Sequence, residues 1–115
     1  MDKLILTTEI ENADFYIASL VIGILEGMKS GDISLEVGVW SLARPIFWKK
    51  LKSSSISAEL IELVSSLDEV DTIRSLGLNA IKKIEEHLLL CKRIQSESLA
   101  KNPSLAIASS LETVS

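Results

Sequence analysis

One short stretch, from Leu25 to Glu36, most constrains what this chain can fold into, because it ends one helix and begins another within a few residues. Gly31 can adopt the left-handed backbone conformation that commonly closes a helix. Ser34 can then cap the next helix by accepting a hydrogen bond from a backbone N–H group of its first turn. Glu36 follows in that first turn, where the helix dipole favours a negative charge. The stretch therefore predicts a helix, a tight corner and a second helix.

The segment before this corner is apolar nearly all round. The eleven residues between Asp14 and Glu26 are apolar except for Ser19 and two small residues. That length is well short of the roughly 18 residues that a membrane span needs, so we expect a buried helix and no membrane span. A helix of this kind must be covered on more than one side, by neighbouring helices or by a second copy of the chain. Its predicted core stripe comprises Ile10, Ala13, Ile17, Leu20, Val21, Ile24, Leu25 and Met28.

The helices are predicted from capping residues and apolar periodicity. Thr8 and Glu11 have the spacing of a capping box, which would begin the first helix. Between Ile33 and Val39 the apolar residues alternate as in a strand but also recur at helical spacing, and the cap at Ser34 favours a helix. Ser57 is expected to cap a further helix, Gly77 to end the one after it, and Asn102-Pro103 to stop the last. Ile46, Phe47 and Leu51 are expected to face inward on the helix that begins at Pro45. The predicted helices cover residues 9–30, 35–43, 45–52, 58–66, 68–76 and 79–100.

Length and composition favour helices packed on helices in one domain. The chain has 115 residues, of which 47% are apolar and only 4% aromatic. Such a chain can bury one core, and its aliphatic composition favours helix packing over a β-sandwich. We therefore predict an all-α, single-domain bundle of five or six helices over residues 1–103. Residues 104–115 are predicted to form a weakly ordered or helical tail, and Lys3–Thr7 either a short strand without a partner or an irregular lead-in.

His87 and Cys91 are the chain's only histidine and cysteine, and they lie four residues apart on the last predicted helix. A catalytic pair would need a third group to orient the imidazole and hydrogen-bond donors for an oxyanion, and the sequence shows neither. A zinc site would need two further ligands. We therefore predict no enzyme activity, no cofactor and no metal, with Cys91 in the core and His87 at the edge of the apolar face. Low cysteine usage is also typical of the reducing cytoplasm, which is the predicted location.

Charged residues are distributed unevenly along the chain, although the net charge is only −4. This acidic balance argues against nucleic acid as a ligand. No acid separates Arg44, Lys49, Lys50 and Lys52. The residues that we predict to form a negative, partner-binding patch are Glu59, Glu62, Asp68, Glu69 and Asp71. Such a patch would speed association with a basic protein by electrostatic steering. The alternative is that these acids are solvated, stabilise helix N-termini or pair with the basic segment.

Two tryptophans are candidate apolar anchors of the same binding surface. Tryptophan is over-represented among the residues that contribute most to the energy of protein interfaces. Trp40 is either a core aromatic or such an anchor. Trp48 precedes Lys49 and Lys50, a combination that nucleic-acid and membrane-surface binders also show. We expect Trp48 to lie half-buried over lysine side chains.

A series of short motifs runs from the corner to the middle of the chain. It comprises Gly31-x-Ile33-Ser34-x-Glu36, Pro45, Leu51-Lys52, Leu67-Asp68-Glu69-Val70-Asp71 and Ser75-Leu76. Together these motifs resemble a small family of uncharacterised bacterial helical proteins, in which an aromatic residue precedes the proline where this chain has Arg44. The resemblance implies a small, bacterial, cytoplasmic protein and brings no active site. At the level of class, a small, acidic, helical chain also resembles bacterial toxin-immunity proteins, which neutralise a toxin in the cytoplasm of the producing cell.

From these observations we predict a noncatalytic protein-binding module. Its specific form would be an immunity-type protein that neutralises a basic toxin through the acids between Glu59 and Asp71, with Trp40 or Trp48 as the anchor. The alternative is a homodimeric structural or regulatory helical protein without a toxin partner. Such a dimer would associate through the apolar first helix.

Overall fold

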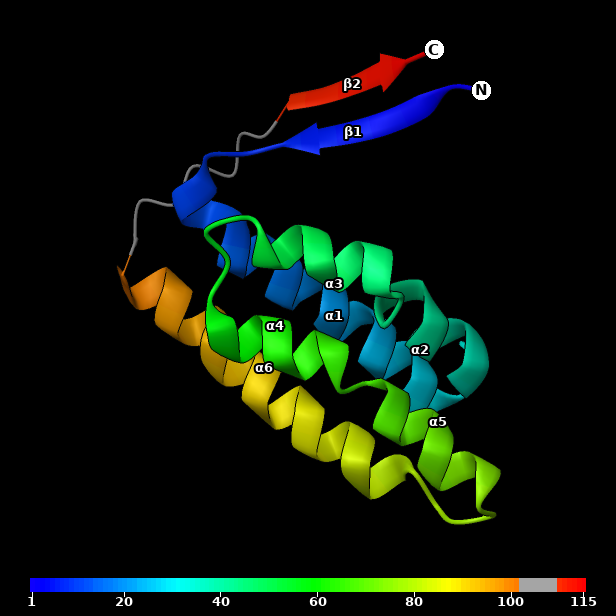
Figure 1. Ribbon diagram of the computed structural model, residues 1–115. Coiled ribbons are helices and arrows are strands. Elements are labelled where there is room, and N and C mark those ends of the chain that lie inside the picture. The colour runs from blue at the N-terminus through cyan, green and yellow to red at the C-terminus, as the bar shows by residue number, and fades with distance from the viewer. Residues whose placement is uncertain (102–109) are drawn as a thin grey trace.

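The computed structural model describes residues 1–101 and 110–115. Within these residues, six α-helices form a bundle and a two-stranded antiparallel sheet joins the two ends of the chain (Figure 1). The predicted helical bundle is therefore confirmed. The elements are β1 (Lys3–Thr7), a 3₁₀ turn (Ile10–Asn12), α1 (Ala13–Ser30), α2 (Leu35–Leu42), α3 (Pro45–Lys52), α4 (Ala58–Ser65), α5 (Asp68–Ser75), α6 (Ile81–Lys101) and β2 (Ser110–Val114).

The helix boundaries follow from capping residues that the sequence predicts. Gly31 has a φ of 87° and closes α1, and Gly77 has a φ of 76° after α5. At the start of α2, the hydroxyl oxygen of Ser34 accepts a hydrogen bond from the Val37 N–H group at 3.2 Å. Ser57 caps α4 in the same way. The predicted corner and the helix on each side of it are therefore confirmed.

The start of α1 differs from the predicted capping box of Thr8 and Glu11. The 3₁₀ turn comes first, and the α-helix begins only at Ala13. Glu9 occupies the cap position of this turn, which leaves Thr8 one residue outside the helical segment. The hydroxyl oxygen of Thr8 is buried and has no hydrogen-bond partner among the described residues. The box does not form because the helical segment begins one residue later than its spacing assumes.

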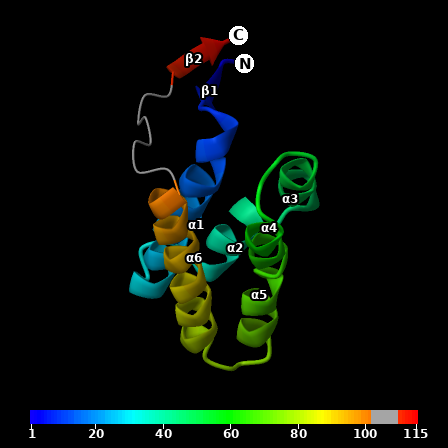
Figure 2. The ribbon, with the colours of Figure 1, turned by 90° about the vertical axis from the view of Figure 1, so that its left-hand side faces the viewer.

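The longest helices, α1 and α6, lie side by side and run in opposite directions (Figures 1 and 2). An ion pair between Glu26 and Lys92, at 3.0 Å, links their exposed sides. A hydrogen bond of 2.8 Å from Gln95 to the Ser19 hydroxyl lies further along the same contact. On the other side of the bundle α3 packs on α4, while α2 packs on both α1 and α5 (Figure 2). Helix α2 therefore bridges the two halves of the bundle.

The core between these helices is almost entirely aliphatic. Its fully buried side chains include Leu25 of α1, Val39 of α2, Leu60 of α4, Val70 of α5 and Ile84 of α6. Burial of large aliphatic side chains supplies most of the favourable free energy of folding in a bundle of this kind. The core therefore holds all of these helices in one unit.

Three residues that we predicted to face the core are exposed. Ile10 is 56% exposed, Leu20 48% and Ile46 82%. Ala18 of α1 is fully buried, as Val21 and Leu25 are, although the predicted stripe omitted it. Periodicity shows which residues share a face of a helix but does not show which faces have a neighbour. The principal neighbours of α1 are α2, α4 and α6, and they do not cover the face that carries Leu20.

The strands pair the beginning of the described chain with its end. β1 and β2 are antiparallel, with Leu4 opposite Thr113 and Leu6 opposite Leu111. The strand that we considered at Lys3–Thr7 is therefore confirmed, but it has a partner, which we did not expect.

The predicted weakly ordered or helical tail is corrected for Ser110–Val114, which form the strand β2. Residues 104–109 and the predicted helix stop at residues 102 and 103 lie outside the described residues. The pairing could not be predicted from the sequence because the strands are far apart in the chain. Thr7 and its opposite residue Ser110 are separated by 103 positions. Contacts of such long range leave no local signal in a short segment.

Candidate protein-binding surface

Two acids of the predicted partner-binding patch are paired with bases of α6. Glu59 forms an ion pair with Arg93. Glu69 forms another with the Nζ atom of Lys83, at 3.2 Å. Neither base belongs to the basic segment between residues 44 and 52, which we had considered as the internal partner. Exposed pairs of this kind stabilise a fold only slightly, but they set a positive charge beside each acid. The patch is therefore not continuously negative.

Three of the five acids of the patch lie at the start of α5, and this position explains them in part. Asp68, Glu69 and Asp71 lie in its first turn, where the helix dipole favours negative charge. Asp71 also forms an ion pair with Arg74 at 2.6 Å. Within the described residues, Glu62 and Asp68 form no ion pair. These two carboxylates are the part of the predicted patch that is left to attract a basic partner.

The outward face of α2 carries Trp40, one of the two predicted anchors. Trp40 is 38% exposed, and the neighbouring Val37 is 64% exposed. Together with Glu36, Ser41 and Arg44 they line an open hollow of about 650 Å³. We refer to these five residues as the Trp40 surface. Its centre is apolar and accessible to a partner's side chain.

The opposite face of α2 explains why Trp40 points outward. Gly38, Val39 and Leu42 are buried against the bundle. A Cβ atom at Gly38 would lie only 2.2 Å from the Sδ atom of Met28, so glycine permits a close approach of α2 to α1. Since α2 is only eight residues long, this buried face fixes the direction of the exposed one.

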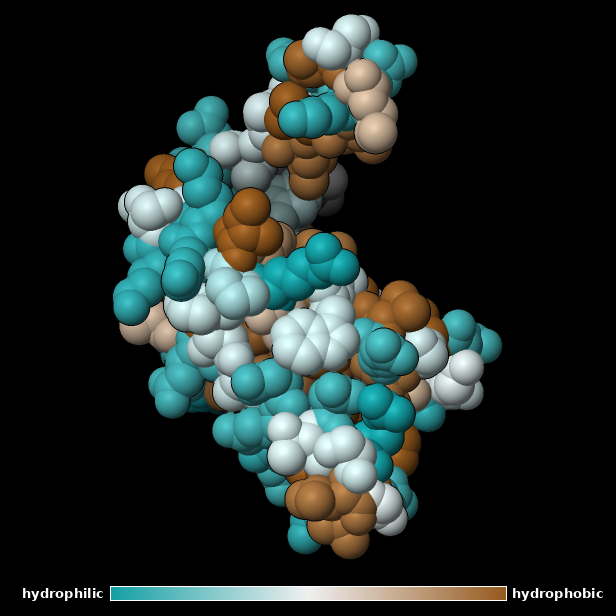
Figure 3. Space-filling view, turned by 45° about the vertical axis from the view of Figure 1, so that its right-hand side comes forward, coloured by the Kyte–Doolittle hydropathy of each residue, from teal (hydrophilic) through white to brown (hydrophobic). Residues whose placement is uncertain are grey.

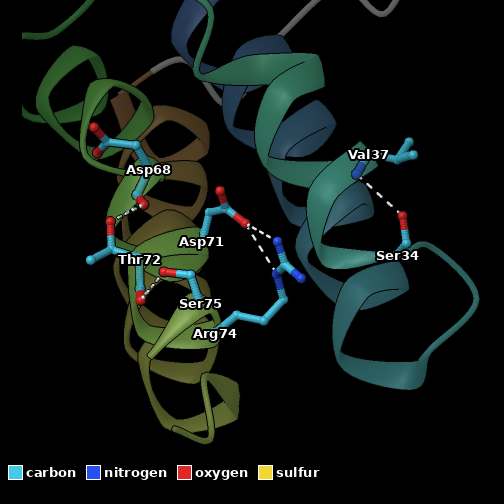
Figure 4. A network of polar contacts seen from close by, with 7 residues as sticks. All are labelled: Ser34, Val37, Asp68, Asp71, Thr72, Arg74 and Ser75. Atoms are coloured by element: carbon cyan, nitrogen blue, oxygen red, sulfur yellow. Dashed lines mark hydrogen bonds and ion pairs between the residues drawn. The ribbon is translucent and has the colours of Figure 1, made fainter. Parts of the chain in front are cut away.

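Charged groups surround the apolar centre of the Trp40 surface. The Nε atom of Arg44 donates a hydrogen bond of 2.9 Å to the carbonyl oxygen of Trp40, near the C-terminal end of α2. Asp71 and Arg74 project from α5 toward α2 (Figure 4). Hydrogen bonding to Asp71 raises the pKa of Arg74 above its ordinary value, and the negative charge of Glu36 acts in the same direction. The surface therefore has both positive and negative groups around an apolar centre.

Trp48, the second predicted anchor, belongs to a different part of the molecule. It is half-buried, as predicted, and it contacts a lysine: the Nζ atom of Lys49 lies over its ring, 5.8 Å from the ring centroid. Together with Lys52 and Glu62 it lines a smaller hollow of about 270 Å³ between α3 and α4. No residue lines both hollows. The structure thus places the two predicted anchors in separate hollows.

His87 and Cys91 are both buried on the inner side of α6. Cys91 is fully buried, as predicted, and His87 is 8% exposed, which is deeper than the predicted edge of the apolar face. Burial raises the pKa of the Cys91 thiol to about 12. An activated thiol has a lowered pKa, so the environment of Cys91 acts in the opposite direction. Burial lowers the pKa of His87, and the positive charge of Lys83 acts in the same direction.

Within residues 1–101 and 110–115, no three side chains of histidine, cysteine, aspartate or glutamate lie close enough together to hold a metal ion. In the same residues, no helix has both the length and the apolar character that are needed to cross a membrane.

The sequence pointed to Trp40 but not to the residues around it. Glu36 and Arg44 lie four positions before and after Trp40, a spacing of about one helical turn that was visible in the sequence. The exposure of Val37 and the approach of Arg74 depend on how α2 packs against α1 and α5. Neither the exposure of Val37 nor the approach of Arg74 could therefore be predicted from the sequence.

The chain was also compared with known protein families, curated proteins and solved structures. Residues 8–110 match the family described as "Protein of unknown function (DUF3969)". No curated protein and no solved structure matches the chain. The predicted resemblance to an uncharacterised family is confirmed by this match, which covers most of the sequence, and the chain belongs to the DUF3969 family.

Proposed function

We propose that this protein is a noncatalytic protein-binding module that binds its partner through the Trp40 surface. The observation that carries the proposal is the exposure of Val37 and Trp40 at the centre of a hollow on α2. Protein interfaces commonly have an apolar centre with a polar rim, and tryptophan is enriched among their energetically dominant residues.

The rim charges indicate the chemistry of the partner. Glu36 contributes a negative group and Arg44 a positive one. The ion pair between Asp71 and Arg74 on α5 adds one charge of each sign close enough for Glu36 to act on Arg74. A complementary partner would insert an apolar side chain beside Trp40 and would place charges of both signs around it. This pattern fits a folded protein surface better than it fits nucleic acid, which requires a mainly positive surface.

An immunity-type protein of the bacterial cytoplasm, acting on a basic toxin, is the specific form that we propose. The net charge of −4 supports attraction of a basic partner at long range. Glu62 and Asp68, which form no ion pair within the described residues, would contribute to that attraction. Co-expression with a basic toxin encoded beside this gene should restore growth of the host cell. Continued growth arrest at equal protein levels would contradict the immunity role.

The binding role is tested by measuring affinity for a captured and purified partner. We expect Trp40→Ala to weaken binding by at least about 30-fold, which corresponds to about 2 kcal/mol. Leu89→Ala on α6 is a matched control, because Leu89 is an apolar side chain that is 74% exposed but lies outside the Trp40 surface. This control should leave the affinity nearly unchanged.

The outcomes of this experiment separate the surface from the rest of the molecule. Equal effects of Trp40→Ala and Leu89→Ala would contradict binding through the Trp40 surface. Charge reversal at Glu62 and Asp68 should slow association and lower its salt dependence, with little effect on dissociation. A change in the dissociation rate alone would contradict a steering role for these two acids.

A further inference from the structure

β1 and β2 form a two-stranded ribbon, which we call the terminal ribbon, and it extends away from the helices (Figures 1 and 2). Every residue of both strands is exposed. A two-stranded sheet alone in water is only marginally stable, and independent stability requires further strands or a covered apolar face. The helices cover neither face of the ribbon within the described residues. The ribbon therefore lacks a partner that its stability requires.

The two faces of the terminal ribbon differ in polarity. Side chains of directly opposed residues share a face, and successive residues alternate between the faces. Leu4, Leu6, Leu111 and Thr113 therefore lie on one face, which carries no charge. The three leucines are 73%, 51% and 64% exposed, and Figure 3 shows apolar side chains gathered on the strands. The other face carries Lys3, Ile5, Thr7, Ser110, Glu112 and Val114.

The two free edges of the ribbon differ in charge. β2 has Glu112 at its centre, whereas the centre of β1 is Leu4-Ile5-Leu6. The register between the strands is continuous, so no bulge interrupts either edge. A charge at the centre of an edge strand is a common protection against pairing with another chain. The edge of β2 is therefore protected, and the edge of β1 is not.

We propose that β1 pairs in antiparallel orientation with β1 of a second copy of this chain, so that two ribbons form a four-stranded sheet. With the two-fold axis at Ile5, Leu4 of each copy lies opposite Leu6 of the other. Lys3 then lies opposite Thr7, so no like charges face each other across the new contact. A second copy fits because a symmetric interface must be complementary to itself, and this uncharged strand meets that condition.

Charge complementarity selects β1 over β2 for this contact. The same symmetric pairing through β2 would place Glu112 directly opposite Glu112, which is destabilising. Pairing through β1 also supplies the additional strands that the ribbon lacks, and it joins the leucine faces of the two ribbons into one continuous apolar surface. This dimer uses no residue of the Trp40 surface, so it is independent of the proposed binding function.

The test is the mass of the full chain in solution, measured by sedimentation equilibrium from low to high micromolar concentration. We expect a reversible equilibrium between monomer and dimer. Ile5→Lys should abolish the dimer because two lysines then meet at the axis. Ile5→Glu should do the same when it is combined with Glu112→Gln, which removes the like charge opposite residue 5 within the ribbon. An equimolar mixture of the two variants should form a heterodimer, since opposite charges then face each other. Glu112→Lys is the matched control on the other edge and should leave the dimer intact.

Each other result overturns the proposal. A monomer mass for the unmodified chain over the whole range would do so, as would failure of the mixed variants to associate. Circular dichroism of each variant would establish that its helices are folded. A dimer that persists in Ile5→Lys but is lost in Leu4→Lys would show that the leucine faces pack on each other, which is a different arrangement.

Discussion

Replacing Gly38 with alanine tests whether the position of α2 depends on its close approach to α1. The added Cβ atom would lie 2.2 Å from Sδ and 2.4 Å from Cγ of Met28, a side chain that is only 3% exposed. Nonbonded atoms in good contact are about 3.5–4 Å apart, so Met28 would have to move by more than about 1 Å in a close-packed core. Overpacking of this kind costs about 1–3 kcal/mol.

A second contribution to this prediction has the opposite sign. Alanine is favoured over glycine in a helix interior by about 1 kcal/mol. We therefore expect Gly38→Ala to lower the free energy of unfolding by up to about 2 kcal/mol after this gain is included. Gly23→Ala is the matched control, because a Cβ atom at Gly23 on α1 would meet nothing within 4 Å. This control should be more stable than the unmodified protein by about 0.5–1 kcal/mol.

Urea unfolding, followed by far-ultraviolet circular dichroism, measures both variants. The two denaturation midpoints should move in opposite directions without a change in the slope of the free energy against urea. Adding Met28→Ala to Gly38→Ala should cost less than the sum of the two single effects, with a coupling energy of at least about 1 kcal/mol. Additive effects, or a stabilising effect of Gly38→Ala, would refute the close approach as the constraint on α2.

Three further predictions concern buried or bridging side chains. Asp14→Ala removes the carboxylate that accepts a hydrogen bond from the Ser57 N–H group at 2.9 Å. The variant should lose about 1–2 kcal/mol in the same urea assay, and Asp14→Asn, which keeps an acceptor, should lose less. Burial lowers the pKa of His87 below its ordinary value of 6.5, so the unfolded chain binds this proton more readily than the folded chain does. The associated contribution to stability is therefore present above pH 6.5 and is lost as the pH falls through the folded-state pKa. His87→Gln should therefore flatten the dependence of the urea midpoint on pH in that range, and an unchanged slope would contradict this account. With a thiol pKa of about 12, the buried Cys91 should react with iodoacetamide at neutral pH only when the chain unfolds, so rapid labelling without urea would contradict its burial.

The features that the sequence predicted well are the ones that local chemistry determines. The hydroxyl caps at Ser34 and Ser57 and the left-handed glycines at Gly31 and Gly77 involve residues within one turn of each other. Each of them ends or begins a helix in the structure. Local hydrogen bonds and backbone preferences of this kind can be identified without knowledge of the fold.

The features that the sequence did not predict depend on contacts between distant segments. β2 is a strand because β1 pairs with it, and neither strand has enough apolar contact to form alone. Likewise, the sequence predicted that Glu59 belongs to a negative patch, whereas in the structure it forms an ion pair with Arg93 of α6. The candidate site shows the same division, because Trp40 could be identified by residue type while the exposure of Val37 depends on packing.

The terminal ribbon and the Trp40 surface lie at opposite ends of α1. The ribbon is adjacent to the N-terminal end of this helix, whereas α2 follows its C-terminal end (Figure 1). An 18-residue helix is about 27 Å long, so a dimer joined through β1 would leave the Trp40 surface of each copy accessible. Such a dimer would be bivalent, and a partner displayed in several copies would bind it more tightly than it binds the monomer. Ile5→Lys should therefore remove this gain in avidity and leave the affinity for a single partner molecule unchanged. A loss of affinity for the single partner would show that the ribbon itself contacts it.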